Sequence, residues 1–378
     1  MSALPLSDVK VLDLTRLLPG GFCSLLLADL GAEVLKVERP GSGDDTRGWG
    51  PPFDERGHAT YFQSVNRNKR SIALDLADPA GAERARSLAA AADVVVENFR
   101  PGVMQALGLD YGSLSAQRPG LVYCSITGFG SGDGARLPGY DLLVQAVGGL
   151  MSITGPPDGE PQKVGVALVD VLAGLFSTVG ILAALRHRDR TGEGQLIEVD
   201  LLSSLLAALV NQGSAYTIAG AVPQRLGNAH PSITPYELYR TGDGELVLAV
   251  GNERQFQALC ETLGDAALAS DERFLTNTDR VAHREPLRAR LQELLAAAPA
   301  AEWAARLTEA RVPAGVVNDL HGAFELARSL GLEPIVRAPR EDGGTVAVTR
   351  NPIRLSRTPP SYRSAPPSLP ESAGSESG

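Results

Sequence analysis

Strand-like and helix-like stretches alternate along the first half of the chain, and no other feature constrains the fold as strongly. Apolar, β-branched runs at 9–14 and 32–37 flank a helical pattern at 24–30, and an Ala-rich helical pattern at 79–92 precedes another such run at 94–97. Strands that alternate with helices of this length form βαβ units, in which the strands lie parallel. The sequence therefore predicts an α/β fold with a mostly parallel sheet.

The pattern changes in the second half, where charged, Ala-rich helical segments predominate. We expect residues 1–225 to form the first part of a large domain and residues 226–312 to form a smaller domain. Helix and strand patterns at 313–356 are expected to return to the large domain. Pro and Ser dominate residues 357–378 without apolar periodicity, so we expect a disordered tail there.

Charge and cysteine content limit the partners and the compartment. The chain carries 35 Lys and Arg against 44 Asp and Glu, a formal net charge of −9, which argues against a nucleic-acid partner or an anionic membrane surface. Its cysteines, Cys23, Cys124 and Cys260, form no CxxC pair, which indicates a reducing compartment. The start lacks a signal-peptide pattern, and the apolar run 171–185 is shorter than the ~20 residues that span a membrane. We expect a cytoplasmic protein without a membrane segment.

The standard cofactor and metal motifs are missing. The chain has no GxGxxG dinucleotide fingerprint, no GxxxxGK[ST] phosphate loop, no HExxH zinc motif and no GxSxG nucleophile elbow. Its histidines are scattered without metal-ligand spacing: His58, His187, His230, His283 and His321. We therefore expect neither a metal nor a permanently bound cofactor.

Asp170 stands at the junction of two apolar segments. Residues 164–169 have the pattern of an extended segment, and residues from 171 to about 187 have that of a buried helix. One interpretation is that Asp170 caps the helix, which is worth about 1 kcal/mol. The other is that the helix N-terminus keeps the carboxylate ionised as a nucleophile, with free backbone N–H groups nearby to hold an oxyanion. The residues alone leave both interpretations open.

Basic residues recur where the predicted strands begin or end. Arg16, Arg39 and Arg100 each follow a strand-like run, and Lys69 and Arg70 precede another. Open α/β sheets bind their ligands at the carboxyl ends of the strands. Any one of these residues is more often a solvated surface charge, but their recurrence favours a shared anionic ligand.

Five longer motifs occur in order: VLDLTRLLPGGFCSLLLADLGAEVLKVERPGSGDDTR, SVNRNKRSIALDL, DVVVENFRPGVMQALGLDY, GYDLLVQAVGGLMSITG and RTGEGQLIEVDLLSS. Together they resemble the family III CoA-transferases, which include formyl-CoA transferase, carnitine-CoA transferase and the α-methylacyl-CoA racemases. The likeness runs from about residue 5 to 260 and more loosely to about 355. Within the family, the chain is most similar to dicarboxylate CoA-transferases of the succinyl-CoA:glutarate type, through RGWGPPF, YCSITGFG, GLMSITGPPDGEP and GNAHPSITPYELYRT.

The resemblance implies a fold and an activity. The implied fold is a Rossmann-like large domain built from both ends of the chain, a smaller α+β domain, and an interlocked homodimer. The implied activity is transfer of CoA from an acyl-CoA, here succinyl-CoA, to a free dicarboxylate such as glutarate, hydroxymethylglutarate, itaconate, mesaconate or citramalate. The CoA thioester is then a substrate, and the intermediate is an aspartyl-CoA thioester.

The resemblance also implies roles for particular residues. Asp170 matches the family's catalytic aspartate, and Tyr140 stands where the racemases have a histidine. Arg67, His230 and Ser232 are candidates for binding the second carboxylate of a dicarboxylate. Tyr140 joins the positions that match CoA-contacting residues of the family: Arg16, Leu17, Arg39, Leu74, Asn98, Phe99 and Arg100.

Two other functions remain open at this point. An α-methylacyl-CoA racemase would exchange the proton at C2 of its substrate, and the tyrosine at 140 argues against it. A non-catalytic acyl-CoA-binding protein on the same scaffold would form no adduct on Asp170. The glycine-rich lid of formyl-CoA transferase has no clear counterpart at 227–232, so the sequence does not indicate what shields the intermediates from water.

Overall fold

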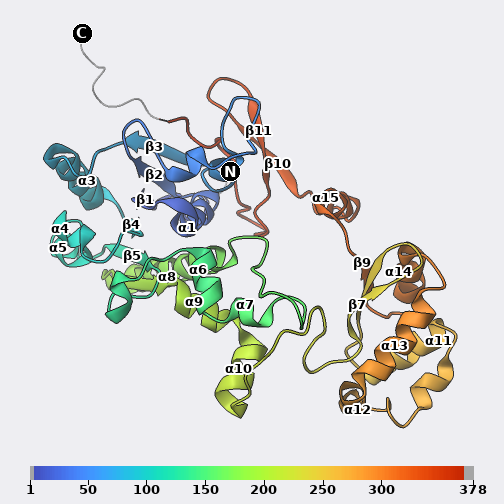
Figure 1. The fold of residues 1–378 in the computed structure, drawn as a ribbon. Helices are drawn as coiled ribbons and strands as arrows, with labels where there is room; N and C mark the ends of the chain where they lie inside the picture. Colours follow the sequence, from blue (N-terminus) through green and yellow to red (C-terminus); the bar gives the residue numbers. More distant parts are fainter. Residues whose placement is uncertain (1–3, 370–378) are drawn as a thin grey trace. The chain divides into compact units, whose positions relative to one another are not determined.

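The computed structural model describes residues 4–369. The chain divides into two compact units, both drawn in Figure 1. The larger unit contains the described residues of Met1–Leu150, Lys163–Val222 and Glu333–Gly378. The smaller unit contains Met151–Gln162 and Pro223–Leu332.

A six-stranded sheet forms the centre of the larger unit. Its strands are β1 (Lys10–Asp13), β2 (Glu33–Glu38), β3 (Lys69–Ala73), β4 (Val94–Glu97), β5 (Val122–Thr127) and β6 (Leu196–Asp200). The spatial order is β3-β2-β1-β4-β5-β6, and every neighbouring pair is parallel. This is the order of a doubly wound nucleotide-binding sheet, in which the winding reverses between β1 and β4. The predicted α/β class and parallel sheet are confirmed.

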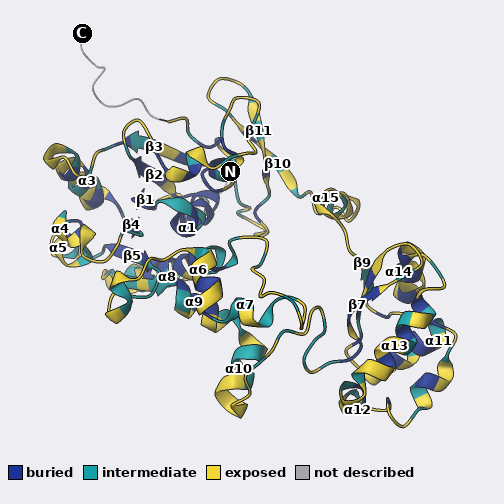
Figure 2. Cartoon of the chain, in the orientation of Figure 1, coloured by how far each residue is buried: buried dark blue, intermediate teal, exposed yellow. Residues whose placement is uncertain are grey.

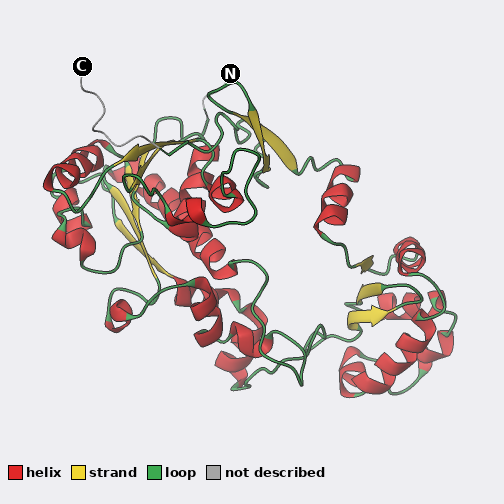
Figure 3. Cartoon of the chain, turned by 45° about the horizontal axis from the view of Figure 1, so that its top comes forward, coloured by secondary structure: helices red, strands yellow, loops and turns green. Residues whose placement is uncertain are grey.

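Alternating side chains of the central strands enter two separate cores, one on each face of the sheet. Figure 2 colours these strands by burial, and Figure 3 shows the helices, in red, beside the yellow strands. Val94 and Val96 of β4 pack with residues of α1 and α8, whereas Val95 packs with residues of α3, α4 and α5. The helices of this unit are α1 (Leu17–Asp29), α2 (Thr60–Val65), α3 (Pro79–Ala91), α4 (Val103–Ala106), α5 (Tyr111–Ser115), α6 (Asp141–Val147), α8 (Leu168–Thr191), α9 (Leu201–Ala208) and α10 (Val210–Ala219), and α7 (Leu150–Ile153) crosses into the smaller unit.

Helix α8 is longer than the sequence pattern predicted. It covers 24 residues from Leu168 to Thr191, so Asp170 lies inside its first turn rather than in front of it. Its length and composition would allow it to cross a membrane, but the buried core helices of soluble proteins have the same length and composition. Ala173, Ile181 and Ala184 are fully buried in the core that α8 shares with α1 and the sheet.

The smaller unit has an antiparallel sheet in the order β7-β8-β9 and a separate apolar core. Its elements are β7 (Tyr236–Arg240), β8 (Glu245–Ala249), β9 (Ala314–Val316), α11 (Glu253–Thr262), α12 (Asn277–Ala282), α13 (Arg284–Leu295), α14 (Ala300–Glu309) and α15 (Leu320–Ser329). Leu246 of β8 pairs with Val316 of β9. The predicted boundary at 312 is therefore wrong, because the chain after 312 supplies the third strand of this sheet.

A second correction concerns residues 151–162, which were expected in the large domain. The Arg225 guanidinium donates to the carbonyls of Pro156 and Gly159, and the Gly227 N–H donates to the Gly155 carbonyl. These bonds tie the 151–162 segment to the chain that enters the smaller unit.

The chain then returns to the larger unit through the hairpin of β10 (Ile335–Pro339) and β11 (Thr345–Thr349). Residues 361–365, expected to belong to a disordered tail, pack at the end of α1. Ser361 N–H donates to the Asp29 carbonyl, and the Arg363 guanidinium donates to the carbonyls of Ala28, Gly31 and Ala32. The tail prediction is wrong for this segment because these residues satisfy carbonyls at the C-terminal end of a buried helix. Residues 370–378 lie outside the described part of the chain.

Candidate active site

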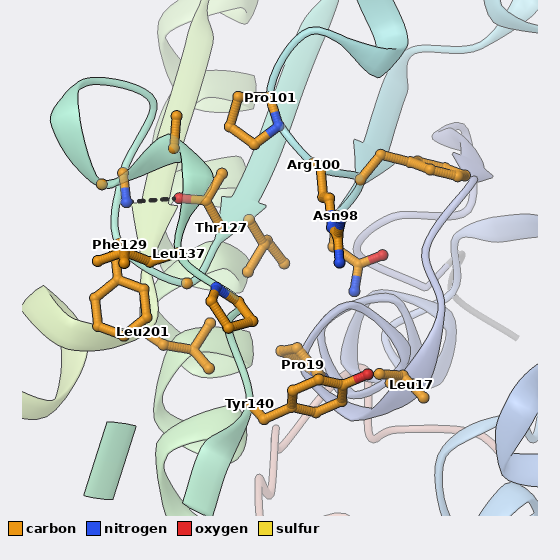
Figure 4. Close-up of a pocket in the computed structure, with 18 of the residues that line it drawn as sticks. Leu17, Pro19, Asn98, Arg100, Pro101, Thr127, Phe129, Leu137, Tyr140 and Leu201 are labelled. Atoms are coloured by element: carbon orange, nitrogen blue, oxygen red, sulfur yellow. Dashed lines mark hydrogen bonds between the residues drawn. The ribbon is translucent and has the colours of Figure 1, made fainter. Parts of the chain in front are cut away.

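A cavity of about 380 Å³ opens at the carboxyl ends of β4 and β5, beside the N-terminus of α1 (Figure 4). Every residue that lines it belongs to the larger unit. The site therefore lies next to the point where the winding of the sheet reverses, which is where doubly wound sheets bind nucleotide ligands. The structure brings together here seven of the predicted residues: Arg16, Leu17, Asn98, Phe99, Arg100, Tyr140 and Asp170.

Arg39 and Leu74 line a second cavity, of about 360 Å³, in the same unit. The two cavities share Arg16, Phe99 and Val103. A ligand longer than either cavity can thus reach from the end of β2 to the first turn of α8. The roles of these residues toward CoA stay predictions.

The loop between β1 and α1 is held by buried polar groups. Lys36, fully buried on β2, donates to the Thr15 carbonyl at 2.8 Å and forms an ion pair with Asp44 at 2.9 Å. Leu17, at the start of α1, has a φ of 65°, a left-handed conformation that is costly for a leucine. The surrounding bonds thus hold a strained backbone at the mouth of the cavity, and no local sequence pattern indicated the buried Lys36–Asp44 pair.

Positive charge in this region is only partly neutralised by the protein. The guanidinium of Arg16 lies 4.9 Å from the centre of the Phe99 ring. Partial burial lowers the pKa of Arg16, and the nearby Arg39 cation lowers it further, whereas the Asp45 and Asp44 carboxylates oppose the shift without cancelling it. Arg39 itself pairs with Asp45. Two neighbouring guanidinium groups beside adjoining cavities form a suitable place for phosphate oxygens.

Asp170 lines the cavity but does not cap its own helix. The N-cap position of α8 is Ala167, and the capping acceptor is Asp141 at the start of α6. Asp141 Oδ1 accepts from the backbone N–H of Val169 at 2.8 Å and from that of Asp170 at 3.4 Å. The capping interpretation of Asp170 is therefore wrong, and its carboxylate remains available to the cavity.

The expected oxyanion hole at this helix start is also wrong. Asp141 takes the N–H groups of Val169 and Asp170, and the Val171 N–H donates to the Ala167 carbonyl. The Leu168 N–H donates to Val166. None of these first-turn donors is free to bind a developing oxyanion.

The surroundings of Asp170 favour its neutral form. Burial raises the pKa of Asp170 to about 7, and the Asp141 carboxylate adds to the rise. The helix N-terminus, which was expected to keep the group ionised, is outweighed by desolvation. Tyr61 of α2 is a further neighbour that the sequence motifs missed, since its own pKa is raised by burial and by Asp170 and Asp141. A carboxyl group that titrates near neutrality inside a cavity is a candidate for covalent or acid–base chemistry.

Tyr140 extends from the loop before α6 toward Leu17 and Pro19 at the start of α1 (Figure 4). It is 59% exposed, so the ring is accessible to a ligand that enters the cavity. On the other side, the Thr127 hydroxyl accepts from the Gly130 N–H at 3.0 Å and fixes the glycine-rich turn after β5.

Arg67 does not reach the cavity. Its guanidinium is buried and forms two hydrogen bonds with Asp29, Nε to Oδ1 at 2.9 Å and Nη2 to Oδ2 at 2.6 Å, and Nη1 donates to the Thr349 carbonyl. The proposed substrate role of Arg67 is therefore wrong, since all of its side-chain nitrogens bond to α1 and β11.

His230 and Ser232 belong to the smaller unit and line neither of these two cavities. The His230 Nδ1 accepts from the Ser232 N–H at 3.1 Å, and the His230 carbonyl accepts from Arg284 at 2.7 Å. Partial burial and Arg284 lower the pKa of His230. Their role toward a carboxylate stays a prediction. Among residues 4–369, no three His, Cys, Asp or Glu side chains are grouped so as to hold a metal ion.

Comparison with known proteins gives a consistent result. The model of "CoA-transferase family III" matches residues 6–372. The chain is 46% identical to the succinate–glutarate CoA-transferase of Agrobacterium fabrum, with 97% of this chain and 93% of the relative covered, and 40% identical to the succinyl-CoA:mesaconate CoA-transferase of Haloarcula marismortui, with 97% and 94% covered. A crystal structure of a CAIB/BAIF family protein from Brucella suis superposes with a TM-score of 0.86 at 44% identity, covering 97% of both chains.

Proposed function

Because the chain belongs to CoA-transferase family III, we propose that it moves CoA from succinyl-CoA to a small dicarboxylate such as glutarate, itaconate, mesaconate or citramalate. The observation that carries this proposal is the Asp170 carboxyl, which titrates near neutrality in a cavity beside Arg16 and Arg100. The names of the similar proteins support succinyl-CoA as donor and a dicarboxylate as acceptor.

The reaction uses Asp170 as a covalent nucleophile. A carboxylate oxygen of Asp170 attacks the thioester carbonyl of succinyl-CoA, the C–S bond breaks, and a mixed anhydride and CoA thiolate form. The thiolate attacks the Asp170 acyl carbon, which gives an aspartyl-CoA thioester and releases succinate. The acceptor carboxylate then attacks this thioester, and the released thiolate takes the acceptor acyl group, so that the Asp170 carboxylate is regenerated.

The two adjoining cavities support a binding mode for CoA. The nucleotide end lies in the cavity lined by Arg39 and Leu74, and the acyl-pantetheine arm passes Phe99 to reach Asp170. Arg16 is common to both cavities and faces the charged middle of the ligand. Such a mode needs no permanently bound cofactor, since each step exchanges an acyl group between sulfur and oxygen.

We also propose that the chain works as an interlocked homodimer in the cytoplasm. Helix α10 exposes Val210 at 72% and Ile218 at 85%, and α15 of the smaller unit exposes Leu320 at 79%. Large apolar side chains left this exposed on helices favour a contact with another protein chain. All three cysteines are free thiols, as expected in a reducing compartment. Light scattering should then give twice the 39.7 kDa of one chain, and a single-chain mass would contradict the dimer.

The function is tested by product analysis and by trapping. The protein is incubated with succinyl-CoA and each dicarboxylate, and new CoA thioesters are identified by mass spectrometry. In parallel, hydroxylamine or borohydride traps the adduct after mixing with succinyl-CoA alone, and peptide mapping locates it. We expect modification of Asp170, and Asp170→Ala should abolish both transfer and trapping while CoA binding persists. Exchange of the C2 proton without an acceptor, or a protein that binds CoA without an adduct, would instead support the racemase or the silent binder.

A further inference from the structure

We propose that Gln145 is a positioning residue of the transfer reaction: it fixes Asp141, and through Asp141 the first turn of α8 that carries Asp170. This inference rests on the proposed function and adds to it a residue that does not line the cavity. Gln145 lies on α6, one helical turn after Asp141, and its side chain is fully buried.

A chain of hydrogen bonds connects Gln145 to the nucleophile. Gln145 Nε2 donates to Asp141 Oδ2 at 2.7 Å, while Asp141 Oδ1 accepts from the N–H groups of Val169 and Asp170. At its other end, Gln145 Oε1 accepts from the Val164 N–H at 2.9 Å. The two ends of one amide therefore join α6 to the segment that leads into α8.

The direction of the amide is determined by its partners. A carboxylate can only accept and a backbone N–H can only donate, so the Gln145 nitrogen must face Asp141 and its oxygen must face Val164. A buried amide satisfied at both ends resists rotation, because each alternative leaves a buried polar group without a partner. Gln145 thereby holds Asp141 in the one orientation that caps α8.

Several charged or titratable groups lie around this chain. Asp170 and Tyr61 interact electrostatically with Asp141, Tyr61 from α2 and Asp170 from α8. Lys163 immediately precedes Val164, and its exposed ammonium donates to the Val164 carbonyl. Arg16, in the loop between β1 and α1, lines the same cavity as Asp170. The described hydrogen bonds and ion pairs give Asp141 no cationic partner, so its amide and backbone donors determine its position.

Removing the amide tests the positioning role. In Gln145→Leu, Asp141 loses a donor and the Val164 N–H loses its acceptor, so the nucleophile shifts relative to the bound thioester. We expect kcat to fall about a hundredfold, the loss associated with a misplacement near 1 Å, while KM for succinyl-CoA changes less than about threefold. The control is Gln117→Leu, an exposed glutamine after α5, which should leave both constants unchanged.

Reversing the hydrogen-bond polarity gives a rescue that a merely structural residue would not show. In Gln145→Glu, a protonated glutamic acid can donate to Asp141, but an ionised one repels it. Its activity relative to the unsubstituted protein should therefore fall at least about tenfold as the pH rises from 6 to 9. In the double variant Asp141→Asn/Gln145→Glu, the introduced amide donates to the introduced carboxylate, which still accepts from the Val164 N–H. This pair should regain most of kcat without the alkaline loss.

The outcomes separate this inference from the proposed function. The unsubstituted protein is first trapped with succinyl-CoA, and an absent Asp170 adduct would overturn the proposed function and this inference with it. If the adduct forms, an unchanged kcat in Gln145→Leu, or a Gln145→Glu variant whose relative activity does not depend on pH, would overturn the inference alone. If Gln145→Leu fails to fold, recovery in the double variant supports the inference and continued loss in a folded double variant contradicts it.

Discussion

Asn98 and Arg16 hold each other through two hydrogen bonds: the Arg16 N–H donates to Asn98 Oδ1 at 2.8 Å, and Asn98 Nδ2 donates to the Arg16 carbonyl at 2.7 Å. The Asn98 side-chain amide, just after β4, thus supplies the loop after β1 with the two hydrogen bonds that a neighbouring strand would otherwise provide. The two loops meet where the winding of the sheet reverses, and they line the same cavity. The position of Arg16 therefore depends on Asn98.

Asn98→Ala should release the Arg16 loop. The Arg16 N–H and the Arg16 carbonyl both lose their hydrogen bonds to Asn98. Leaving a partly buried backbone group unsatisfied costs about 1–3 kcal/mol of unfolding free energy. Acyl-CoA binding should weaken about tenfold as Arg16 loses its position, and chemical denaturation with isothermal titration checks the two effects. Asn98→Asp is the informative companion, since it keeps the acceptor for Arg16 N–H but not the donor. Full CoA affinity in both variants would contradict this role of Asn98.

Formation of the Asp170 adduct should depend on pH. The pKa of this carboxyl is raised to about 7, so the group is mostly neutral and unreactive below that pH and becomes a carboxylate above it. At saturating succinyl-CoA, the single-turnover rate of adduct formation should rise with pH through about 7 and then level off, which rapid quenching and intact-mass analysis can follow. A rate that is unchanged between about pH 5.5 and 8.5 would exclude Asp170 as the group that titrates.

The same group should make the fold less stable as pH rises. The folded-state pKa of Asp170 lies above its ordinary value of 3.8, so the folded protein binds the proton more tightly than the unfolded chain. Stability is therefore lost between about pH 4 and pH 7, by about 4 kcal/mol in total. Asp170→Asn should be more stable than the unsubstituted protein at about pH 8, and the difference should vanish near pH 4. Urea denaturation at both values measures it, and an equal difference at both would contradict the assignment.

Arg67→Met should destabilise the fold without changing the chemistry. The substitution leaves the Asp29 carboxylate buried without its cation, for which a loss of about 3–5 kcal/mol is typical. Arg70→Met is the matched control, because Arg70 lies three residues further along the chain and its pair with Glu33 of β2 is largely exposed and is worth at most about 1 kcal/mol. Denaturation curves should separate the two variants, whereas kcat per folded molecule should be alike. A strong rise in KM for the dicarboxylate in Arg67→Met alone would restore its substrate role.

Local patterns predicted those parts of the molecule that depend on local physics. The three consecutive valines at Val94–Val96, between two helical patterns, predicted a buried parallel strand. Side chains on both faces of a strand must be apolar when helices cover both faces of its sheet. A carboxylate that interrupts an apolar run marks Asp170 as a candidate functional residue. Its protonation was not predicted, since desolvation and the Asp141 charge depend on how α6 meets α8.

The missed features all come from contacts between distant parts of the chain. Gln145 has no unusual local pattern, and its partner Val164 lies 19 residues away. No local pattern indicates the pair between Arg67 and Asp29, because Asp29 lies 38 residues earlier in the chain. The Pro- and Ser-rich composition after 357 indicated disorder, but Arg363 finds three carbonyls at the end of α1. The composition of a segment indicates how much apolar surface it can bury by itself. It does not indicate which hydrogen-bond partners a distant segment provides.

The hydrogen bonds of Arg363 to the C-terminal end of α1 have a consequence for biosynthesis. The carbonyls that this side chain satisfies belong to Ala28, Gly31 and Ala32, which leave the ribosome more than three hundred residues before it. The domain that begins first is thus completed last, after the inserted domain has been made in full. Until Arg363 has left the ribosome, the nascent chain carries an α/β sheet whose first helix still lacks its closing contact.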